Sequence, residues 1–198
     1  MAGFDRKTMN TLQEILSKIP DKFECRNTTS HKFKKDIYEF FNKSEFKDRI
    51  CVELGVYNGH SSYLLSNLFK QVIGFEISDV RINSARKFVE GVQNVEFIQH
   101  NLYNGPLPIE RGDVFFIDAL HEYESVIKDT LNCLNNVKSD HKKYFIYDDY
   151  GICQPVKKAI NDLISEDKIK LVQYVGYEPN KAFTSPLSDY EGIICIES

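Results

Sequence analysis

The sequence predicts an α/β protein built on a mostly parallel, seven-stranded sheet. From residue 49 onward, short apolar runs alternate with segments that have the apolar spacing of helices. Some of these runs, such as residues 114–117 (Val-Phe-Phe-Ile), are apolar throughout, as is typical of strands buried on both faces. Strand–helix alternation indicates a parallel sheet with helices on both sides. We therefore expect a doubly wound, Rossmann-like fold.

The elements are expected in a definite order along the chain. Two amphipathic helices come first, at residues 11–19, stopping before Pro20, and at residues 33–41. Strands are expected at residues 50–54, 71–77, 94–98, 113–118, 143–148, 169–175 and 191–197, and further helices at 61–69, 79–90, 123–136 and 155–164. The last two strands have no helix between them, which indicates that the last strand pairs antiparallel.

The length of 198 residues suits one domain with a substantial core. We assign residues 1–45 to an N-terminal helical extension that serves as a cap or lid, and residues 46–198 to the sheet domain. The long irregular segment 176–189 between the last two strands is of the kind that often forms a functional loop. Whether the chain is part of a larger protein is left open.

The composition excludes several classes of protein. The net charge of −4 argues against a nucleic-acid partner, because phosphate contacts need clustered Lys and Arg. No signal peptide and no membrane-spanning apolar run is seen in the sequence, so we expect a cytoplasmic protein without a membrane partner. Five scattered cysteines without paired spacing argue against a disulfide framework or a zinc site.

The turn after the first expected strand carries two glycines four residues apart. Glu53, Gly55 and Gly59 form the pattern Glu-x-Gly-x-x-x-Gly, and Ser61 opens the next helix. Glycine lets the backbone approach a ligand closely. Glu76 ends the following apolar run, at about the twenty-residue spacing that is usual for a carboxylate that binds a ribose. The sequence thus predicts a site for a nucleoside-containing cofactor.

Acidic residues end two further expected strands. Asp118 ends the fourth strand, and Asp148 and Asp149 end the fifth. Because ligands bind at the carboxyl ends of parallel strands, we expect these side chains to share one cleft. Three carboxylates repel one another unless a positive charge lies between them, and oxygen ligands suit a hard divalent ion. We therefore expect Mg²⁺, or another divalent cation.

The glycine pattern resembles motif I of the class I S-adenosylmethionine-dependent methyltransferases. The dinucleotide fingerprint G-x-G-x-x-G would need glycines where this chain has Tyr57 and His60. The resemblance implies that S-adenosylmethionine is the cofactor and that residues 46–198 form a methyltransferase domain.

The same resemblance assigns parts of the cofactor to individual residues. It implies that Gly55 and Gly59 line the methionine part, that Ser61 contacts the methionine carboxylate and that Glu76 binds the ribose hydroxyls. Asn101, where the family more often has Asp, would contact the adenine edge. The full implied cofactor-binding set is Glu53, Gly55, Tyr57, Gly59, Ser61, Glu76, Asn101 and Asp118.

The acidic segments resemble those of the metal-dependent O-methyltransferases, of both the catechol type and the macrocin/deoxysugar type. The segments 146–151 (Ile-Tyr-Asp-Asp-Tyr-Gly) and 118–123 (Asp-x-x-His-x-Tyr) are most similar to the second group. The resemblance implies that Asp118, Asp148 and Asp149 hold the metal.

His121 is the leading candidate for the catalytic base. It stands three residues after Asp118, where catechol-type enzymes carry their base, and a neutral imidazole is available near pH 7. Some sugar-type enzymes use an acid two residues after the metal Asp, where this chain has Leu120. A metal-ligating His121, or one that only caps the next helix, is the alternative.

The sequence therefore predicts an S-adenosylmethionine-dependent, Mg²⁺-dependent O-methyltransferase that acts on a hydroxyl of a sugar, glycan or other small molecule. A catechol or phenol O-methyltransferase is one alternative. A nucleotide-cofactor oxidoreductase and a non-catalytic methyltransferase-like interaction module are alternatives of other classes. The glycine spacing argues against the first of these two, and the intact acidic triad against the second. The acceptor and the oligomeric state, with a homodimer among the possibilities, are left open.

Overall fold

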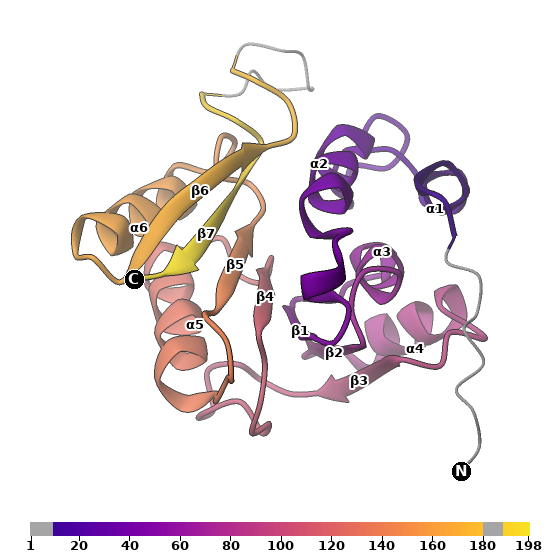
Figure 1. The fold of residues 1–198 in the computed structure, drawn as a ribbon, viewed down its shortest axis with the longest axis horizontal. Coiled ribbons are helices and arrows are strands. Elements are labelled where there is room, and N and C mark those ends of the chain that lie inside the picture. Colours follow the sequence, from indigo (N-terminus) through magenta and orange to yellow (C-terminus); the bar gives the residue numbers. More distant parts are fainter. Residues whose placement is uncertain (1–9, 180–187) are drawn as a thin grey trace.

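One sheet forms the centre of the protein (Figure 1). Within residues 10–179 and 188–198, which the computed structural model describes, it has seven strands in the order β3-β2-β1-β4-β5-β7-β6. All neighbours pair parallel except β7, which is antiparallel to both β5 and β6. The predicted fold class is thus confirmed. The strands are β1 (Ile50–Leu54), β2 (Gln71–Glu76), β3 (Val95–Gln99), β4 (Val114–Ile117), β5 (Tyr144–Tyr147), β6 (Ile169–Val175) and β7 (Gly192–Glu197).

Helices cover both faces of this sheet, with α1 to α4 on one side and α5 and α6 on the other (Figure 1). Polar side chains cap the N-termini of three helices: Thr11 and Glu14 form a capping box at α1, and Ser30 and Ser78 cap α2 and α4. The helices are α1 (Leu12–Lys18), α2 (His31–Phe41), α3 (His60–Ser66), α4 (Asp79–Phe88), α5 (Tyr123–Asn136) and α6 (Gln154–Ser165), with a short 3₁₀ helix, η1, at Ser44–Phe46.

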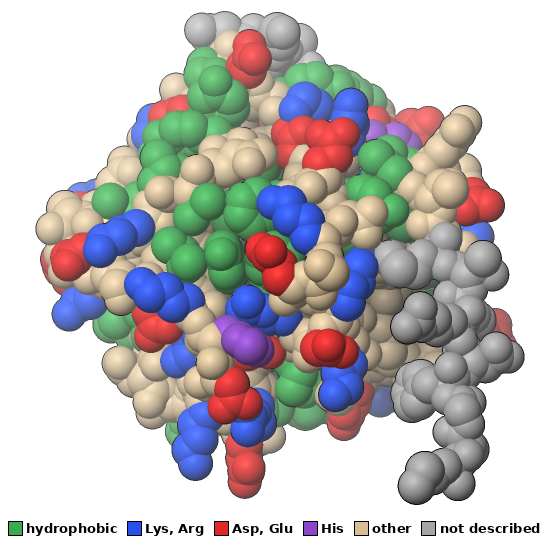
Figure 2. Space-filling model, in the orientation of Figure 1, with side chains coloured by type: hydrophobic (Ala, Val, Ile, Leu, Met, Phe, Trp, Pro, Cys, Tyr) green, Lys and Arg blue, Asp and Glu red, His purple; other side chains and the backbone are tan. Residues whose placement is uncertain are grey.

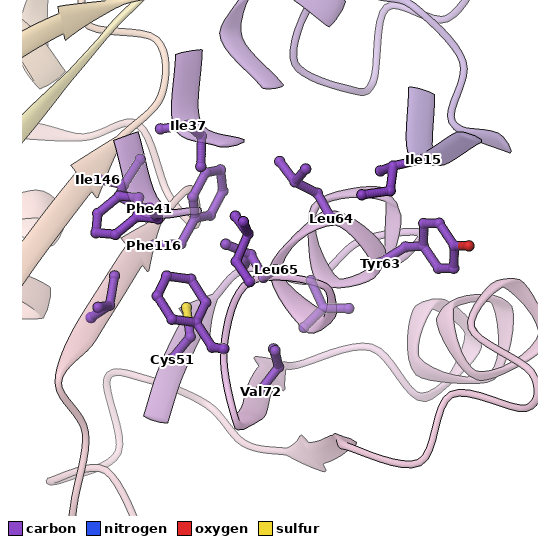
Figure 3. Packing of buried hydrophobic residues seen from close by; sticks show 14 of the residues in the cluster. Ile15, Ile37, Phe41, Cys51, Tyr63, Leu64, Leu65, Val72, Phe116 and Ile146 are labelled. Atoms are coloured by element: carbon purple, nitrogen blue, oxygen red, sulfur yellow. The ribbon is translucent and has the colours of Figure 1, made fainter. Parts of the chain in front are cut away.

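The strands bury side chains on both faces, as their apolar sequences predict. Along β4, Val114 and Phe116 enter the core under α1 to α4, whereas Phe115 and Ile117 enter the core under α5 and α6. Figure 3 shows Phe41 of α2 and Leu65 of α3 gathered with other members of the first core. Alternate side chains of one strand thus hold two layers of helices, which fixes the strand ends relative to the loops above them.

The N-terminal helix α2 is packed directly on the sheet. The Phe33 ring meets the Phe116 ring of β4 edge to face, with centroids 6.1 Å apart. Phe41 packs in the same manner against Phe46, Phe69 and Tyr144. The buried aromatic rings make α2 part of the main core, and the division of the chain at residue 45 stays a prediction.

The strand β6 lies at one edge of the sheet. Its register against β7 shifts between Leu171 and Gln173, so the ladder of β6 is irregular at Val172. Leu171, Val172 and Tyr174 are 42%, 41% and 37% exposed. This edge therefore presents apolar side chains to solvent on an interrupted strand.

Gly55 makes a close approach possible between the ends of β1 and β4. Its φ is +92°, and a Cβ at this position would lie 2.2 Å from the carbonyl oxygen of Asp118. The backbone N–H of Asp118 in turn donates to the carbonyl of Leu54 at 2.9 Å. No side chain fits between these two backbones, so glycine is required here.

We predict that Gly55→Ala lowers the free energy of unfolding by roughly 3 kcal/mol or more, because it adds a backbone clash to the strain of a positive φ. The matched control is Gly91→Ala. Gly91 also has a positive φ, of +82°, but no atom of the described residues lies within 4 Å of its added Cβ, so this change should cost only about 1 kcal/mol. Urea denaturation measures both, and equal losses would contradict the close approach.

Candidate active site

A cleft of about 530 Å³ lies at the carboxyl edge of the sheet. Its walls come from four parts of the chain: the link between α1 and α2, the turn after β1, and the segments that follow β4 and β5. On the face of the molecule shown in Figure 2, acidic and basic side chains are interspersed rather than separated into patches. The side chains that matter most for the chemistry of the cleft are Lys22, Tyr57, Asp118, His121, Asp148 and Asp149.

Asp118, His121 and Asp149 form a compact cluster in this cleft. The Nε2 atom of His121 lies 3.2 Å from Oδ1 of Asp118 and 3.3 Å from Oδ2 of Asp149. One ligand atom from each of the three residues lies within 4.8 Å of the other two. Two carboxylate oxygens and one imidazole nitrogen at this spacing form a donor set that fits a divalent cation.

Asp148 lies beside this cluster but outside it. Its side chain lines the cleft and is buried, and within residues 10–179 and 188–198 its Oδ1 has no hydrogen-bond partner. The next residue, Asp149, has a φ of +57°, a left-handed conformation that is uncommon for a residue other than glycine. The ligand set of Asp118, Asp148 and Asp149 stays a prediction; the candidate group that the structure brings together consists of Asp118, His121 and Asp149.

Burial and mutual repulsion shift the pKa values of these groups. Burial raises the pKa of Asp118 and that of Asp148, and the charge of Asp149 raises both further. The hydrogen bond to Asp118 raises the pKa of His121 to about 9, against the opposing effect of burial. The two carboxylates therefore favour the protonated imidazole, and a metal ion that used Nε2 as a ligand would have to displace this proton.

Lys22 brings a further positive charge that the sequence reasoning missed. Its Nζ lies 3.5 Å from Oδ1 of Asp149 and 3.9 Å from Oε1 of Glu191, and its side chain is only 14% exposed. Three carboxylates in one cleft predict a compensating cation, but nothing in the sequence indicates that a residue 127 positions away supplies it. Only the fold brings Lys22 to this place.

Glu191 anchors the segment that carries Lys22. This carboxylate is fully buried at the start of β7. It accepts hydrogen bonds from the backbone N–H and the hydroxyl of Ser30, at 2.9 and 2.5 Å, and from the backbone N–H of Tyr177 at 3.2 Å. The link between α1 and α2 is thereby held against the sheet.

The turn after β1 is joined to the end of β2 through Glu76. The Glu76 carboxylate accepts hydrogen bonds from the backbone N–H groups of Tyr57 and Ser78, both at 3.0 Å. The guanidinium of Arg81 lies 3.8 Å from the centroid of the Tyr57 ring, and the Tyr57 hydroxyl accepts from Asn27 at 3.0 Å. Tyr57 therefore connects the predicted cofactor turn to the N-terminal wall of the cleft.

The remaining predicted cofactor residues lie around the same edge. Gly59, with a φ of +80°, is the N-cap of α3, and Ser61 lies in its first turn. Asn101 follows β3, where its side-chain oxygen accepts from the Tyr103 backbone at 3.0 Å. Glu53 is different, because it is fully buried beneath the turn, where the Ser62 hydroxyl donates to it.

Solved methyltransferases share this fold at low sequence identity. A structure of SMU.1697c, a methyltransferase from Streptococcus mutans, in complex with S-adenosylhomocysteine has a TM-score of 0.60 at 16% identity, covering 83% of this chain and 97% of that one. The N-methyltransferase NodS from Bradyrhizobium japonicum has a TM-score of 0.65 at 10% identity, covering 95% and 98%. An rRNA methylase from Streptococcus thermophilus has a TM-score of 0.58 at 15% identity, covering 82% and 94%. The fold is thus that of the class I methyltransferases.

The family itself is shown by the sequence. Residues 52–150 match the family described as a methyltransferase domain, so the chain belongs to that family. No curated protein matches the chain. Among the helices that the structure describes, none is long and apolar enough to cross a membrane.

We predict that Glu53 makes stability fall as the pH rises. Burial raises its pKa from 4.5 to about 8. Because the folded-state pKa lies above the unfolded value, the contribution of Glu53 to the free energy of unfolding is fully present below pH 4.5 and is lost as the pH rises through about 8. Between these values the free energy of unfolding falls by up to about 1.4 kcal/mol per pH unit. Glu53→Gln should lack this fall, as measured by urea denaturation from pH 5 to 8.

The control for this measurement is Glu110→Gln, since Glu110 is an exposed glutamate. Its stability profile should run parallel to that of the wild type. A parallel profile for Glu53→Gln as well would show that Glu53 titrates alike in the folded and unfolded states.

Proposed function

We propose that the protein is an S-adenosylmethionine-dependent O-methyltransferase that uses a divalent cation to methylate a hydroxyl group of a sugar, glycan or other small molecule. The observation that carries this proposal is the junction between the glycine turn and the acidic cluster. Gly55 packs on the backbone of Asp118, and Asp118 is also a member of the group with His121 and Asp149. A methyl donor held at the turn would therefore lie next to a cation held by the cluster.

Several features of the turn support S-adenosylmethionine as the cofactor. Glu76 is already oriented by two backbone N–H groups, and a carboxylate in this position suits two ribose hydroxyls. Ile77 and Leu120, which follow β2 and β4, are 60% and 49% exposed, and such apolar side chains suit a flat adenine ring. We assign the methionine part to Gly55, Gly59 and Ser61, and the adenine edge to Asn101. Glu53 would act from below, by supporting the turn.

The acidic cluster supports the use of a cation. Its donors are two carboxylate oxygens and one imidazole nitrogen, a set that suits Mn²⁺ as well as Mg²⁺. When bound, the cation would lower the pKa of the acceptor hydroxyl and orient its oxygen toward the methyl group. Asp118 and Asp149 would hold it, and Asp148, with its unpartnered oxygen, would face it through the cleft.

For His121 we propose the role of a ligand rather than a base. The same Nε2 atom faces both carboxylates, at 3.2 and 3.3 Å. A nitrogen that points into the donor set cannot also accept a proton from the acceptor in the same step. The alternative that the sequence left open is therefore preferred.

A sugar or glycan is the preferred acceptor. Its support is the similarity of the two acidic segments to those of the macrocin/deoxysugar group, and a cleft of about 530 Å³ is large enough for such a molecule. The exposed Phe23 ring on the cleft wall would pack against the apolar face of a sugar. The phenol alternative is distinguished by turnover on catechols.

The cofactor assignment is tested with Glu76→Gln. This change keeps the size of the side chain but removes the charge that the ribose hydroxyls would meet, so S-adenosylmethionine should bind about tenfold more weakly. Calorimetric titration measures the affinity, with NADH as the comparison ligand. Glu96→Gln, at an exposed position on β3, is the matched control. Preferential binding of NADH by the wild type would overturn the cofactor assignment.

The cation assignment is tested with Asp149→Asn. We expect this variant to lose Mn²⁺ or Mg²⁺ binding and methyl transfer to sugars while it keeps its affinity for S-adenosylmethionine, because Asp149 is not one of the residues assigned to the cofactor. Asp140→Asn, at an exposed carboxylate paired with Arg111, should behave as the wild type. Turnover that survives both a chelator and Asp149→Asn would refute the metal mechanism.

A further inference from the structure

Lys22 reaches the acidic cluster from the far end of the chain. It belongs to the link between α1 and α2, which Figure 1 draws at the upper end of α2. Its Nζ lies 3.5 Å from Asp149 and 3.9 Å from Glu191. Burial alone would lower the pKa of Lys22, but the surrounding carboxylates outweigh it and raise that pKa above its ordinary value. Lys22 is thus a firmly charged ammonium group at a candidate ligand of the cation.

The two oxygens of Asp149 face different partners. Oδ2 faces His121, at 3.3 Å, and Oδ1 faces Lys22, at 3.5 Å. A divalent cation in the group formed by Asp118, His121 and Asp149 would therefore lie within a few ångströms of the ammonium group. Like charges this close repel strongly enough to change a binding constant by about tenfold or more.

We propose that Lys22 and the divalent cation compete for Asp149, so that cation binding releases the Lys22 ammonium group and loosens the stretch 20–26 of the cleft wall. This inference rests on the proposed function. Lys22 would act as a positioning residue: it holds Asp149 in place and keeps the wall against the cluster while the cation is absent.

Release of Lys22 would affect the shape of the cleft, because residues next to it in the chain line the cleft wall. Phe23 and Arg26 lie on the same stretch, and both line the cleft. The Phe23 ring packs edge to face on Tyr177, with centroids 5.8 Å apart. The stronger anchor at Ser30 lies further along and does not involve Asp149. Release of Lys22 would therefore change the wall at Phe23 without undocking α2.

The test is the affinity of the protein for Mn²⁺ alone, measured by electron paramagnetic resonance of the free ion. We expect Lys22→Met to bind Mn²⁺ about tenfold or more tightly than the wild type. Lys22→Arg, which keeps the charge, should stay within about twofold of the wild type. Lys35→Gln removes a lysine from an exposed pair with Glu39, and it should also stay within about twofold, because exposed charges are screened.

Hydrogen exchange supplies a second measurement. Saturating Mn²⁺ should speed amide exchange in residues 20–26 of the wild type, whereas in Lys22→Met exchange there should already be fast and insensitive to Mn²⁺. Lys22→Gln replaces Lys22→Met if the latter fails to fold, which thermal unfolding shows.

The outcomes separate the inference from the proposed function. Unchanged or weaker Mn²⁺ binding by Lys22→Met overturns the competition, since a purely structural lysine would give that result, and leaves the proposed function standing. A lack of Mn²⁺ binding in every variant, with S-adenosylhomocysteine still bound, overturns both the competition and the metal mechanism. Loss of S-adenosylhomocysteine binding by the wild type overturns the proposed function itself.

Discussion

Compensation of buried negative charge is the constraint on which the rest of this structure depends. The carboxyl edge of the sheet gathers several buried or half-buried acids, and burial raises the pKa of Asp118 and Asp148. Uncompensated charges in such a place are costly. The N-terminal segment supplies much of the compensation, and one of its lysines, Lys34, is so deeply buried that its pKa falls to about 8. The acids are Asp118, Asp148, Asp149 and Glu191, and the cations are Lys22, Lys34 and His121.

This compensation also joins the start of α2 to the sheet. Ser30 both caps α2 and donates to Glu191, so the start of α2 and the start of β7 share one polar contact. From there Phe33 reaches the sheet. The link between α1 and α2 is therefore part of the cleft. Its residues cap α2, pair with the acids and form one wall.

The sheet could be predicted almost completely from the sequence, because burial on both faces leaves uninterrupted apolar runs and the strand ends follow from them. The site could be predicted only in part. That Asp118, Asp149 and Glu76 lie at one edge could be expected, because the ends of parallel strands meet there. That His121 rather than Asp148 lies with Asp118 and Asp149 depends on the direction of side chains around a left-handed residue, and the position of Lys22 depends on how a distant loop packs. Neither leaves a local pattern in the sequence.

The irregular edge strand β6 has a consequence for the behaviour of the protein in a crowded solution. An edge strand offers unpaired backbone groups to any other chain, and exposed apolar side chains such as Leu171 and Tyr174 would strengthen such pairing into aggregates. The register shift at Val172 interrupts the straight hydrogen-bonding template that an incoming strand needs. The irregular register is therefore expected to disfavour edge-to-edge pairing of β6 with another chain, although β6 keeps its exposed apolar side chains.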